Sequence, residues 1–350
     1  MEEGGEVVLK KIGVLTGGGD CPGLNSAIRA VVVKAEEFGF EVVGIKYGWQ
    51  GLINLDLQSL NSEQVEEISS WGGTILGSSR TNPLKKEEDK KKVLENIKKL
   101  DLSCLVAIGG DDTLGVANKL HQEGVPAIGI PKTMDNDLFH TDYTFGFDSA
   151  VSVSLDALER LRDTAKSHRR VIVFEVMGRH TGWVALFTGL AGGADWILIP
   201  EVPVDLEEMC NHLKKIRERG KLYGLVVVSE GIELPQVKEK DKEVDAFGHI
   251  ILKERGVGEL VAKEVEEQTG FETRFAVIGH IQRGGAPTVF DRILATRCGI
   301  KAVELIKEGK FGKMTCLQGN EITAVDLELA TSEQKKVPQK LYELARTFFK

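Results

Sequence analysis

The amino-acid sequence predicts an α/β protein with two lobes, each organised around a mostly parallel sheet. Short apolar runs of strand length alternate with amphipathic stretches of helical period along the chain. Such alternation is typical of strands joined by helical crossovers, which leave the strands of one sheet parallel. The 350 residues, 42% of them hydrophobic, suffice for two domains. Neither a solenoid repeat nor a low-complexity tract interrupts the pattern.

The first half of the chain alternates strands and helices. Residues 11–16 form an apolar run that predicts a strand, and 26–37 carry apolar residues at helical spacing. Further strands are expected at 41–45, 105–108 and 125–130. The highly charged stretch 85–99 predicts a helix with a solvated face, not a nucleic-acid patch, and another helix is expected from Leu114.

Residues 141–148 break this alternation, so a second lobe is expected to begin near Phe147. Residues 149–166 have helical periodicity, with apolar side chains on one face. Further strands are expected at 169–176, 196–199, 225–228 and 275–278, and helices at 206–218, 258–268 and 290–307. The charged stretch 235–247 predicts an exposed loop.

Composition excludes several classes of protein. The formal net charge of -8 argues against nucleic acid as the main partner. The five cysteines are scattered without a CxxC pair, which argues against structural zinc and a disulfide framework and favours a reducing compartment. No apolar run reaches membrane-spanning length, and the acidic N-terminus does not resemble a signal peptide. We therefore expect a cytoplasmic protein without a membrane partner.

Two neighbouring strands deliver four aspartates and a lysine to one edge of the predicted sheet. The run at 105–108 ends in Gly-Gly-Asp-Asp-Thr at 109–113, and the run at 125–130 ends in Pro-Lys-Thr-Met-Asp-Asn-Asp at 131–137. Ligands of open α/β sheets lie off the carboxyl ends of strands, where glycines and helix N-termini favour anions. Carboxylates at such a place need a partner, and Mg²⁺ bridging phosphate oxygens is a common one. The stretch predicts magnesium-bound phosphate; the alternative is two ordinary polar turns.

Three other glycine-rich turns follow predicted strands or precede predicted helices, at 17–25, 72–80 and 279–285. None of them is described by GxGxxG or by GxxxxGK[ST], so neither a dinucleotide fingerprint nor a Walker A loop is indicated. The turn at 17–25 has the strand-to-helix position of a phosphate cradle, but by itself it is equally well explained as a tight turn.

Taken together, these motifs resemble the phosphofructokinase family from about residue 10 to about residue 308. The matching segments are 18–20, 22–25, 76–80, 109–111, 133–137, 141–143, 177–179, 200–201, 230–231 and 279–285. The resemblance implies two Rossmann-like lobes and Mg²⁺-dependent phosphoryl transfer to the 1-hydroxyl of fructose 6-phosphate. We expect residues 1–146 plus 282–332 to form the phosphoryl-donor lobe, and residues 147–281 plus 333–350 the fructose 6-phosphate lobe.

The resemblance also assigns the chemistry. Asp135 matches the family's catalytic base, which takes the proton from the sugar hydroxyl, and Asp111 matches its magnesium ligand. Asp137 is close enough in sequence to support the metal or the base. Phosphoryl transfer otherwise needs positioning and charge stabilisation. The residues expected to supply these at the donor side are Arg80, Thr133, Thr113 and the backbone N–H groups of Gly18 and Gly19.

The sugar-phosphate site carries over in the same way. His280 and Arg283 match residues that grip the 6-phosphate, and an arginine fork suits a phosphate dianion. Arg170 and Arg274 match arginines that reach in from a neighbouring subunit, so a homo-oligomer, dimer or tetramer, is implied. The sugar itself is expected to contact Thr133, Asp135, Met177, Gly178, Arg179 and, through its hydroxyls, Glu230.

Two positions bear on the phosphoryl donor. This chain has Asp112 and Lys132 where ATP-using members of the family have glycines. A carboxylate at 112 would crowd and repel the α-phosphate of ATP, whereas an ammonium at 132 is suited to the terminal oxygens of pyrophosphate. Both residues match the pyrophosphate-dependent branch of the family, and ATP as donor is the alternative.

Two other classes of function compete. A NAD or lipid kinase shares a Gly-Gly-Asp loop after a strand, but it does not predict the segment 133–137 or the His280–Arg283 pair. A non-catalytic subunit that binds sugar phosphate should have lost its base or its metal ligand. Because Asp135, Asp111 and Arg80 are all present, the sequence favours an enzyme.

Overall fold

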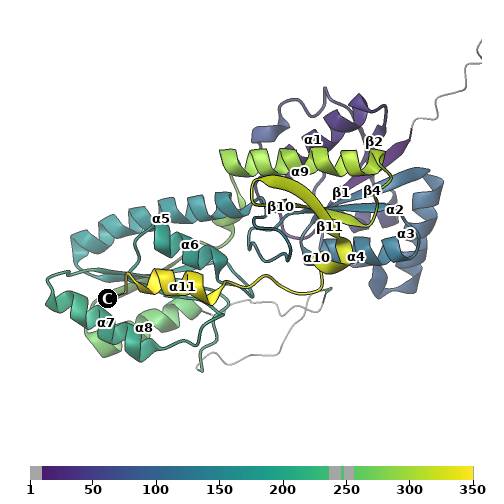
Figure 1. Ribbon diagram of the computed structural model, residues 1–350. Coiled ribbons are helices and arrows are strands. Elements are labelled where there is room, and N and C mark those ends of the chain that lie inside the picture. Colours follow the sequence, from purple (N-terminus) through teal and green to yellow (C-terminus); the bar gives the residue numbers. More distant parts are fainter. Residues whose placement is uncertain (1–9, 236–245, 248–255, 350) are drawn as a thin grey trace, which may run out of the picture.

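Two sheets, one in each lobe, lie along the length of the molecule (Figure 1). The computed structural model describes residues 10–235, 246–247 and 256–349. The chain passes between the lobes at 132–146, at 278–288 and again at 331–338, so segments far apart in the sequence meet where the lobes join.

The larger sheet has the order β11-β10-β5-β4-β1-β2-β3. Its five central strands are parallel, while β3 and β11 pair antiparallel at the two edges. The strands are β1 (Lys11–Thr16), β2 (Glu41–Ile45), β3 (Leu57–Leu60), β4 (Leu102–Gly109), β5 (Ala127–Pro131), β10 (Lys313–Gln318) and β11 (Glu321–Asp326). The buried apolar runs of β1 and β4 are typical of strands covered on both faces.

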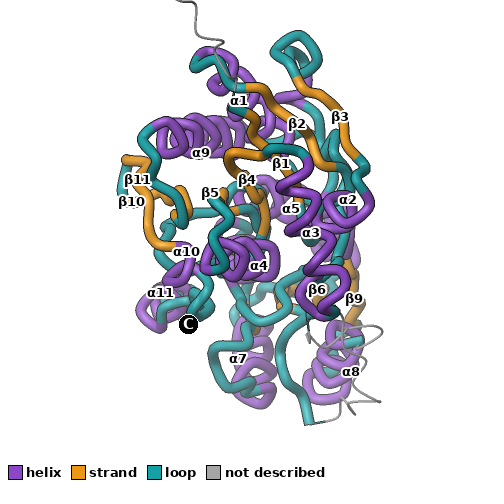
Figure 2. Tube along the Cα trace, turned by 90° about the vertical axis from the view of Figure 1, so that its right-hand side faces the viewer, coloured by secondary structure: helices purple, strands orange, loops and turns teal. Residues whose placement is uncertain are grey.

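Helices cover both faces of the larger sheet. On one face, α1 (Leu24–Glu37) packs along α9 (Val289–Lys307), and Figure 2 shows the two helices side by side. The other face is covered by α2 (Trp49–Asn54), α3 (Glu87–Lys99), α4 (Asp111–Gln122) and α10 (Leu327–Ala330). Leu15 and Leu105 face the second set of helices, whereas Ile12 and Val106 face the first, as the alternation of a strand requires.

The smaller sheet is parallel throughout, in the order β7-β8-β6-β9. Its strands are β6 (Val171–Val176), β7 (Trp196–Leu198), β8 (Gly224–Ser229) and β9 (Thr273–Val277). It packs against α5 (Phe147–His168), α6 (Trp183–Ala191), α7 (Leu206–Glu218), α8 (Val257–Thr269) and α11 (Gln339–Arg346). The two-lobed α/β fold with mostly parallel sheets is confirmed, and α5 starts at Phe147, where the second lobe was expected.

The division of the chain at residues 146, 281 and 332 stays a prediction. Most of the loop expected at 235–247 lies outside the described residues. Strand β3, the β10–β11 hairpin and the helices α2, α6, α10 and α11 were not predicted from the sequence.

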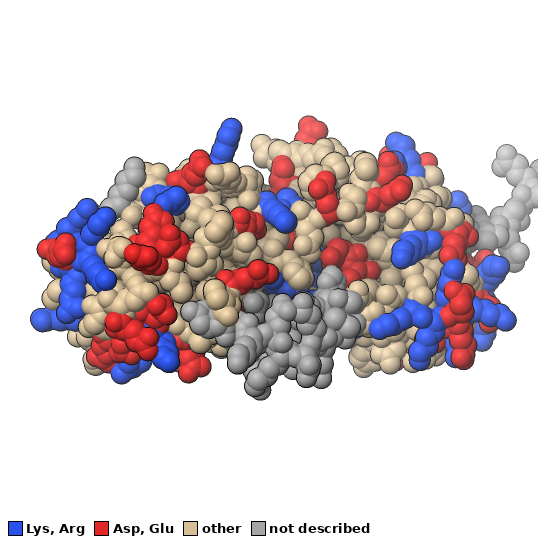
Figure 3. Space-filling view, turned by 90° about the horizontal axis from the view of Figure 1, so that it is seen from below, with Lys and Arg blue, Asp and Glu red and all other residues tan. Residues whose placement is uncertain are grey.

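No helix within the described ranges is long and apolar enough to cross a membrane. On the face seen in Figure 3, both acidic and basic side chains are present on each lobe.

Candidate active site

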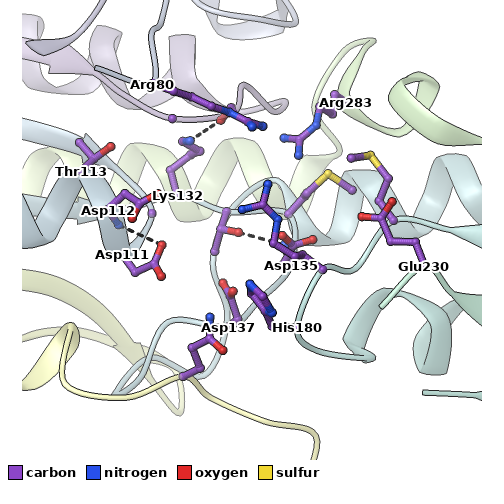
Figure 4. Close-up of a pocket in the computed structure, with 18 residues that line it drawn as sticks. Arg80, Asp111, Asp112, Thr113, Lys132, Asp135, Asp137, His180, Glu230 and Arg283 are labelled. Atoms are coloured by element: carbon purple, nitrogen blue, oxygen red, sulfur yellow. Dashed lines mark hydrogen bonds between the residues drawn. The ribbon is translucent and has the colours of Figure 1, made fainter. Parts of the chain in front are cut away.

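A cavity lies where the carboxyl ends of strands from both sheets meet. The turns after β1, β4 and β5 bring Gly18, Asp111 and Lys132 to its wall, and those after β6 and β8 bring Arg179 and Glu230. Figure 4 shows Lys132, Arg80 and Arg283 on one side of the cavity and Asp111, Asp135 and Asp137 on the opposite side. Of the predicted site residues, the cavity is lined by Gly18, Gly19, Arg80, Asp111, Asp112, Thr113, Lys132, Thr133, Asp135, Asp137, Met177, Arg179, Glu230 and Arg283.

On the donor side, Lys132 is buried against the glycine-rich turn that follows β1. Its Nζ donates a hydrogen bond to the carbonyl of Gly17 at 3.0 Å and another to the carbonyl of Gly19. Only 3% of the residue is exposed, and burial lowers the pKa of its ammonium group below the usual range. Gly18 has φ of 77°, a left-handed conformation that favours glycine. The lysine therefore also fixes the loop whose N–H groups were expected to meet the donor.

The N-terminus of α4 adds acidic side chains to the donor side. Asp111 and Asp112 occupy its first turn, and the Asp111 carboxylate accepts the backbone N–H of Asp112 at 2.9 Å. Thr113 is 2% exposed and packs between two glycines: a Cβ at Gly17 or at Gly109 would lie 2.5 Å or 2.4 Å from its side chain. Thr113 thus packs the turn of β1 against α4.

The acidic loop after β5 places carboxylates opposite the cations. The hydroxyl of Thr133 accepts the backbone N–H of Asp135 at 3.0 Å, which forms a local turn. Burial raises the pKa of Asp135, although Arg283 and Arg179 act in the opposite direction. Burial, Asp135 and Asp111 together raise the pKa of Asp137 to about 8.

These carboxylates repel one another and are suited to a divalent cation. Asp111 and Asp137 are among them, and both face the cavity in Figure 4. Within the described part of the chain, no three acidic, histidine or cysteine side chains converge as a ready-made metal site. A Mg²⁺ ion held here would therefore have few protein ligands and would share its coordination with phosphate oxygens and water, as this ion commonly does.

The sugar side is built from the second lobe. Glu230 accepts the backbone N–H of Gly178 at 3.3 Å, and burial raises the pKa of its carboxyl group. The backbone N–H of Met177 donates to the side-chain oxygen of Gln282 at 2.7 Å. Arg283 also lines the cavity, and its Nη1 donates to the carbonyl of Asp20 at 3.0 Å, in the turn after β1. This arginine therefore holds the turn after β1 against the segment that follows β9.

Four predicted residues do not line this cavity. One is Gly178, whose backbone N–H donates to Glu230 on the cavity wall. His280 lines an adjoining hollow together with Asp20, Arg80 and Arg283. Arg170 and Arg274 both pair with Glu272, at 3.3 Å and 2.8 Å, beside the edge strand β9. Their role in a neighbouring subunit's site stays a prediction.

Four residues on the cavity wall were not among the predicted site residues: Gly110, Met134, His180 and Gln334. Gln282, which does not line the cavity, accepts the backbone N–H of Met177. His180 directly follows the segment 177–179, which matched a family motif, so that motif could have pointed to it. Gln334 comes from the last third of the chain and no motif marked it.

The fold and the site together define a phosphotransferase: a cationic wall, a carboxylate wall and a glycine-rich turn face one another across the junction of two α/β lobes. Residues 11–306 match the Phosphofructokinase family model, and the chain belongs to the phosphofructokinase family.

Named relatives extend over almost the full length of the chain. It is 55% identical to the pyrophosphate–fructose 6-phosphate 1-phosphotransferase of Dictyoglomus thermophilum, over 97% of this chain and 98% of the relative. The enzyme of the same name from Streptomyces coelicolor is 50% identical, over 97% of this chain and 99% of that relative. The ATP-dependent 6-phosphofructokinase of Corynebacterium efficiens is 45% identical, also over 97% and 99%.

Solved structures agree with the fold. The phosphofructokinase of Pichia pastoris in its T-state superposes with a TM-score of 0.81 at 30% identity, over 97% of this chain and 36% of that longer chain. The pyrophosphate-dependent phosphofructokinase of Marinobacter aquaeolei gives a TM-score of 0.82 at 23% identity, over 97% and 92%, which bears on the fold alone.

Proposed function

We propose that this chain transfers a phosphoryl group reversibly from pyrophosphate to the 1-hydroxyl of fructose 6-phosphate, giving fructose 1,6-bisphosphate and phosphate. The observation that carries the choice of donor is the presence of Asp112 and Lys132 on the wall of the cavity that holds Asp135. Four relatives named for pyrophosphate are 48–55% identical to the chain, and four named for ATP are 43–45% identical, which supports the same choice.

The donor pocket is shaped for a short, highly charged anion. The ammonium of Lys132 has three N–H donors, and the carbonyls of Gly17 and Gly19 take two of them. The third is available for a terminal oxygen of pyrophosphate. Asp112 stands at the start of α4, where the α-phosphate of a nucleotide would meet its carboxylate.

Asp135 is the proposed base. It takes the proton of the sugar 1-hydroxyl as that oxygen attacks the terminal phosphorus of the donor. Arg80 and the N–H groups of Gly18 and Gly19 stabilise the charge on the transferring group. Asp111, with support from Asp137, would hold Mg²⁺, which would neutralise negative charge on the phosphoryl donor.

On the sugar side, Arg283 and His280 hold the 6-phosphate, and Met177, Gly178, Arg179 and Glu230 orient the sugar ring. The raised pKa of Glu230 reflects a buried carboxyl group whose natural partner is a hydroxyl. Arg283 spans from the sugar side to Asp20, so binding of the sugar phosphate is linked to the glycine-rich turn.

The active form is proposed to be a cytoplasmic homo-oligomer. The smaller sheet ends in the edge strand β9, which leaves Phe275 and Val277 46% and 54% exposed. Ile281, 70% exposed, follows in the next turn. An apolar sheet edge of this kind favours pairing with another chain, and here it adjoins Arg170 and Arg274. A second copy seated there would receive both arginines.

The test is a steady-state comparison of donors. Purified protein is assayed with fructose 6-phosphate and Mg²⁺, with pyrophosphate in one series and ATP in the other. We expect turnover with pyrophosphate and a much lower kcat/KM with ATP. Substantial turnover with ATP and none with pyrophosphate would reverse the assignment of the donor.

A further inference from the structure

The loop that carries Asp135 and Asp137 is held mainly by side-chain hydrogen bonds. It runs from 132 to 146, between β5 and α5, outside the helices and strands. Asn136, between the two aspartates, has a left-handed φ of 51° and is fully buried. Its Oδ1 accepts the backbone N–H of Thr144 at 3.1 Å, which ties the two limbs of the loop together. The position of Asp135 therefore depends on whatever fixes Asn136.

Lys335 meets this loop from the far end of the sequence. Its Nζ donates three hydrogen bonds of 2.9 Å, to Oδ1 of Asn136 and to the carbonyls of Thr141 and Asp142. Its backbone N–H donates to the carbonyl of Asp137 at 2.8 Å. All three N–H donors of the ammonium are thus used on one loop.

The same residue also contacts the second lobe. The backbone carbonyl of Lys335 accepts the indole N–H of Trp183 at 2.8 Å, and its Nζ lies 5.1 Å from the centre of that indole ring. Two residues on, the backbone N–H of Val337 donates to Glu201 at 3.1 Å, and Glu201 also accepts the N–H of Gly182 at the start of α6. The loop is in this way anchored to α6 through the segment 335–337.

Building on the proposed function, we propose that Lys335 is a positioning residue for the phosphoryl transfer: it holds the loop of Asp135 and Asp137 in register with the sugar-binding lobe. Lys335 itself does not line the cavity, although its neighbour Gln334 does. Lys335 therefore acts on the reaction through the loop. Burial lowers the pKa of its ammonium group to about 8, while the carboxylates of Asp137 and Asp142 act in the opposite direction.

The first test separates kcat from KM. Lys335→Met removes the three donors and retains the aliphatic stem, and Lys336→Met is the matched control because that neighbouring lysine is exposed. We expect kcat to fall roughly 10- to 100-fold in Lys335→Met, as for the loss of charge-assisted hydrogen bonds. The KM for fructose 6-phosphate should change less than about 3-fold. Lys335→Arg should recover part of kcat, and Lys336→Met should behave as wild type. A Lys335→Met enzyme with the wild-type kcat would overturn the proposal.

A chemical rescue tests the charge itself. All five native cysteines are buried. In a Lys335→Cys variant, the new thiol is therefore the one open to aminoethylation, which restores an ammonium on a side chain of lysine length. We expect treatment to raise kcat toward the wild-type value, with no such gain for wild type or for Lys336→Cys treated in parallel. Because aminoethylation restores the length of the side chain as well as its charge, S-propylation of the same variant is the control. Equal recovery of kcat with the neutral propyl group would show a packing role and contradict a role of the charge.

A readout without turnover keeps this proposal separate from the choice of donor. Backbone amide hydrogen exchange of peptides covering 136–144 should be faster in Lys335→Met than in wild type or Lys336→Met. Unchanged exchange would contradict the anchoring role whatever the donor is. If wild type uses ATP instead of pyrophosphate, the donor assignment fails, and the kinetic comparison of Lys335 variants is made with ATP.

Discussion

The surroundings of Asp135 suit it to the role of base that we propose for it. Burial disfavours the ionised form of this carboxyl group and raises its pKa. The guanidinium groups of Arg283 and Arg179 favour the ionised form and act in the opposite direction. A carboxylate with a raised pKa is a stronger base, which suits the removal of a proton from a sugar hydroxyl. The side chains around Asp135 are expected to orient the sugar. A change of Asp135 alone should therefore affect catalysis more than sugar binding.

We therefore predict a selective loss of kcat in Asp135→Asn. The amide has the shape of the carboxylate but cannot accept the hydroxyl proton, so kcat should fall about 10²–10⁴-fold. Binding of fructose 6-phosphate, measured by isothermal titration calorimetry, should be largely retained, and the thermal midpoint should stay close to that of wild type. A variant with near-normal kcat would show that the base lies elsewhere.

At this scale the sequence was informative wherever a functional residue lies in a contiguous motif. Asp111 and Asp135 follow strands that could be predicted, and both line the cavity. Lys335 could not be predicted in this way, because its contacts with Asn136 and Thr141 join residues 199 and 194 positions apart. A lysine in a polar segment carries no local signal of such contacts.

At the scale of elements, periodicity predicted the strands and helices with a distinct pattern. Residues 11–16, 41–45 and 206–218 coincide with β1, β2 and α7. By contrast, α6 is apolar nearly all round and has no amphipathic period, and such runs are ambiguous. Strand β3, Leu-Gln-Ser-Leu, is short and half polar, so it lacked the composition of a strand.

The contact between the turn after β1 and α4 gives a prediction on stability. A Cβ at residue 17 would lie 2.5 Å from Oγ1 and 2.9 Å from Cγ2 of Thr113. Gly17→Ala should lower the free energy of unfolding by about 1–3 kcal/mol, as overpacking does. In a Thr113→Ala background both atoms are absent, so the same change should cost much less. Denaturant unfolding of the four proteins measures the coupling.

Gly115→Ala is the control for this cycle. Residue 115 lies inside α4, and an added Cβ there would meet nothing within 4 Å. Alanine in a helix interior is favoured over glycine by about 0.5–1 kcal/mol, so this variant should be slightly more stable than wild type. Equal losses for Gly17→Ala in both backgrounds would contradict the proposed packing of Thr113.

At the scale of the whole molecule, both lobes supply residues to the cavity wall, and the exposed side chains of the edge strand β9 support the proposed oligomer. Sequence patterns indicated an oligomer only through Arg170 and Arg274. The structure adds a physical reason, since these arginines lie beside the exposed side chains of Phe275 and Val277. The sequence of a single strand does not reveal whether the strand will lie at the edge of a sheet, because strand order is set by the rest of the fold.

Phe275→Glu is therefore expected to produce a monomer with poor affinity for fructose 6-phosphate. A charge on the apolar edge would oppose its burial, and the neighbour's arginines would then be absent from the site. Light scattering at assay concentration, combined with the KM for fructose 6-phosphate, measures both effects. Phe348→Glu, at a residue 66% exposed near the C-terminus, is the control and should remain oligomeric. A fully active monomer would contradict the proposed assembly.

The central claim is that Asp112 and Lys132 together select pyrophosphate. Lys132→Gly removes the ammonium that holds both the glycine-rich turn and the donor, while Asp112 still repels a nucleotide. Asp112→Gly removes the repulsion but leaves Lys132 in the pocket. Because the two residues share one cavity, their effects should not be additive.

The most direct measurement is kcat/KM for pyrophosphate and for ATP in wild type, the two single variants and the double variant. We expect Lys132→Gly to lower kcat/KM for pyrophosphate roughly 10- to 100-fold with little gain for ATP, as for the loss of one charge-assisted contact. The double variant should exceed both single variants with ATP. Unchanged pyrophosphate kinetics in Lys132→Gly would contradict this account of donor choice, even in an enzyme that phosphorylates fructose 6-phosphate.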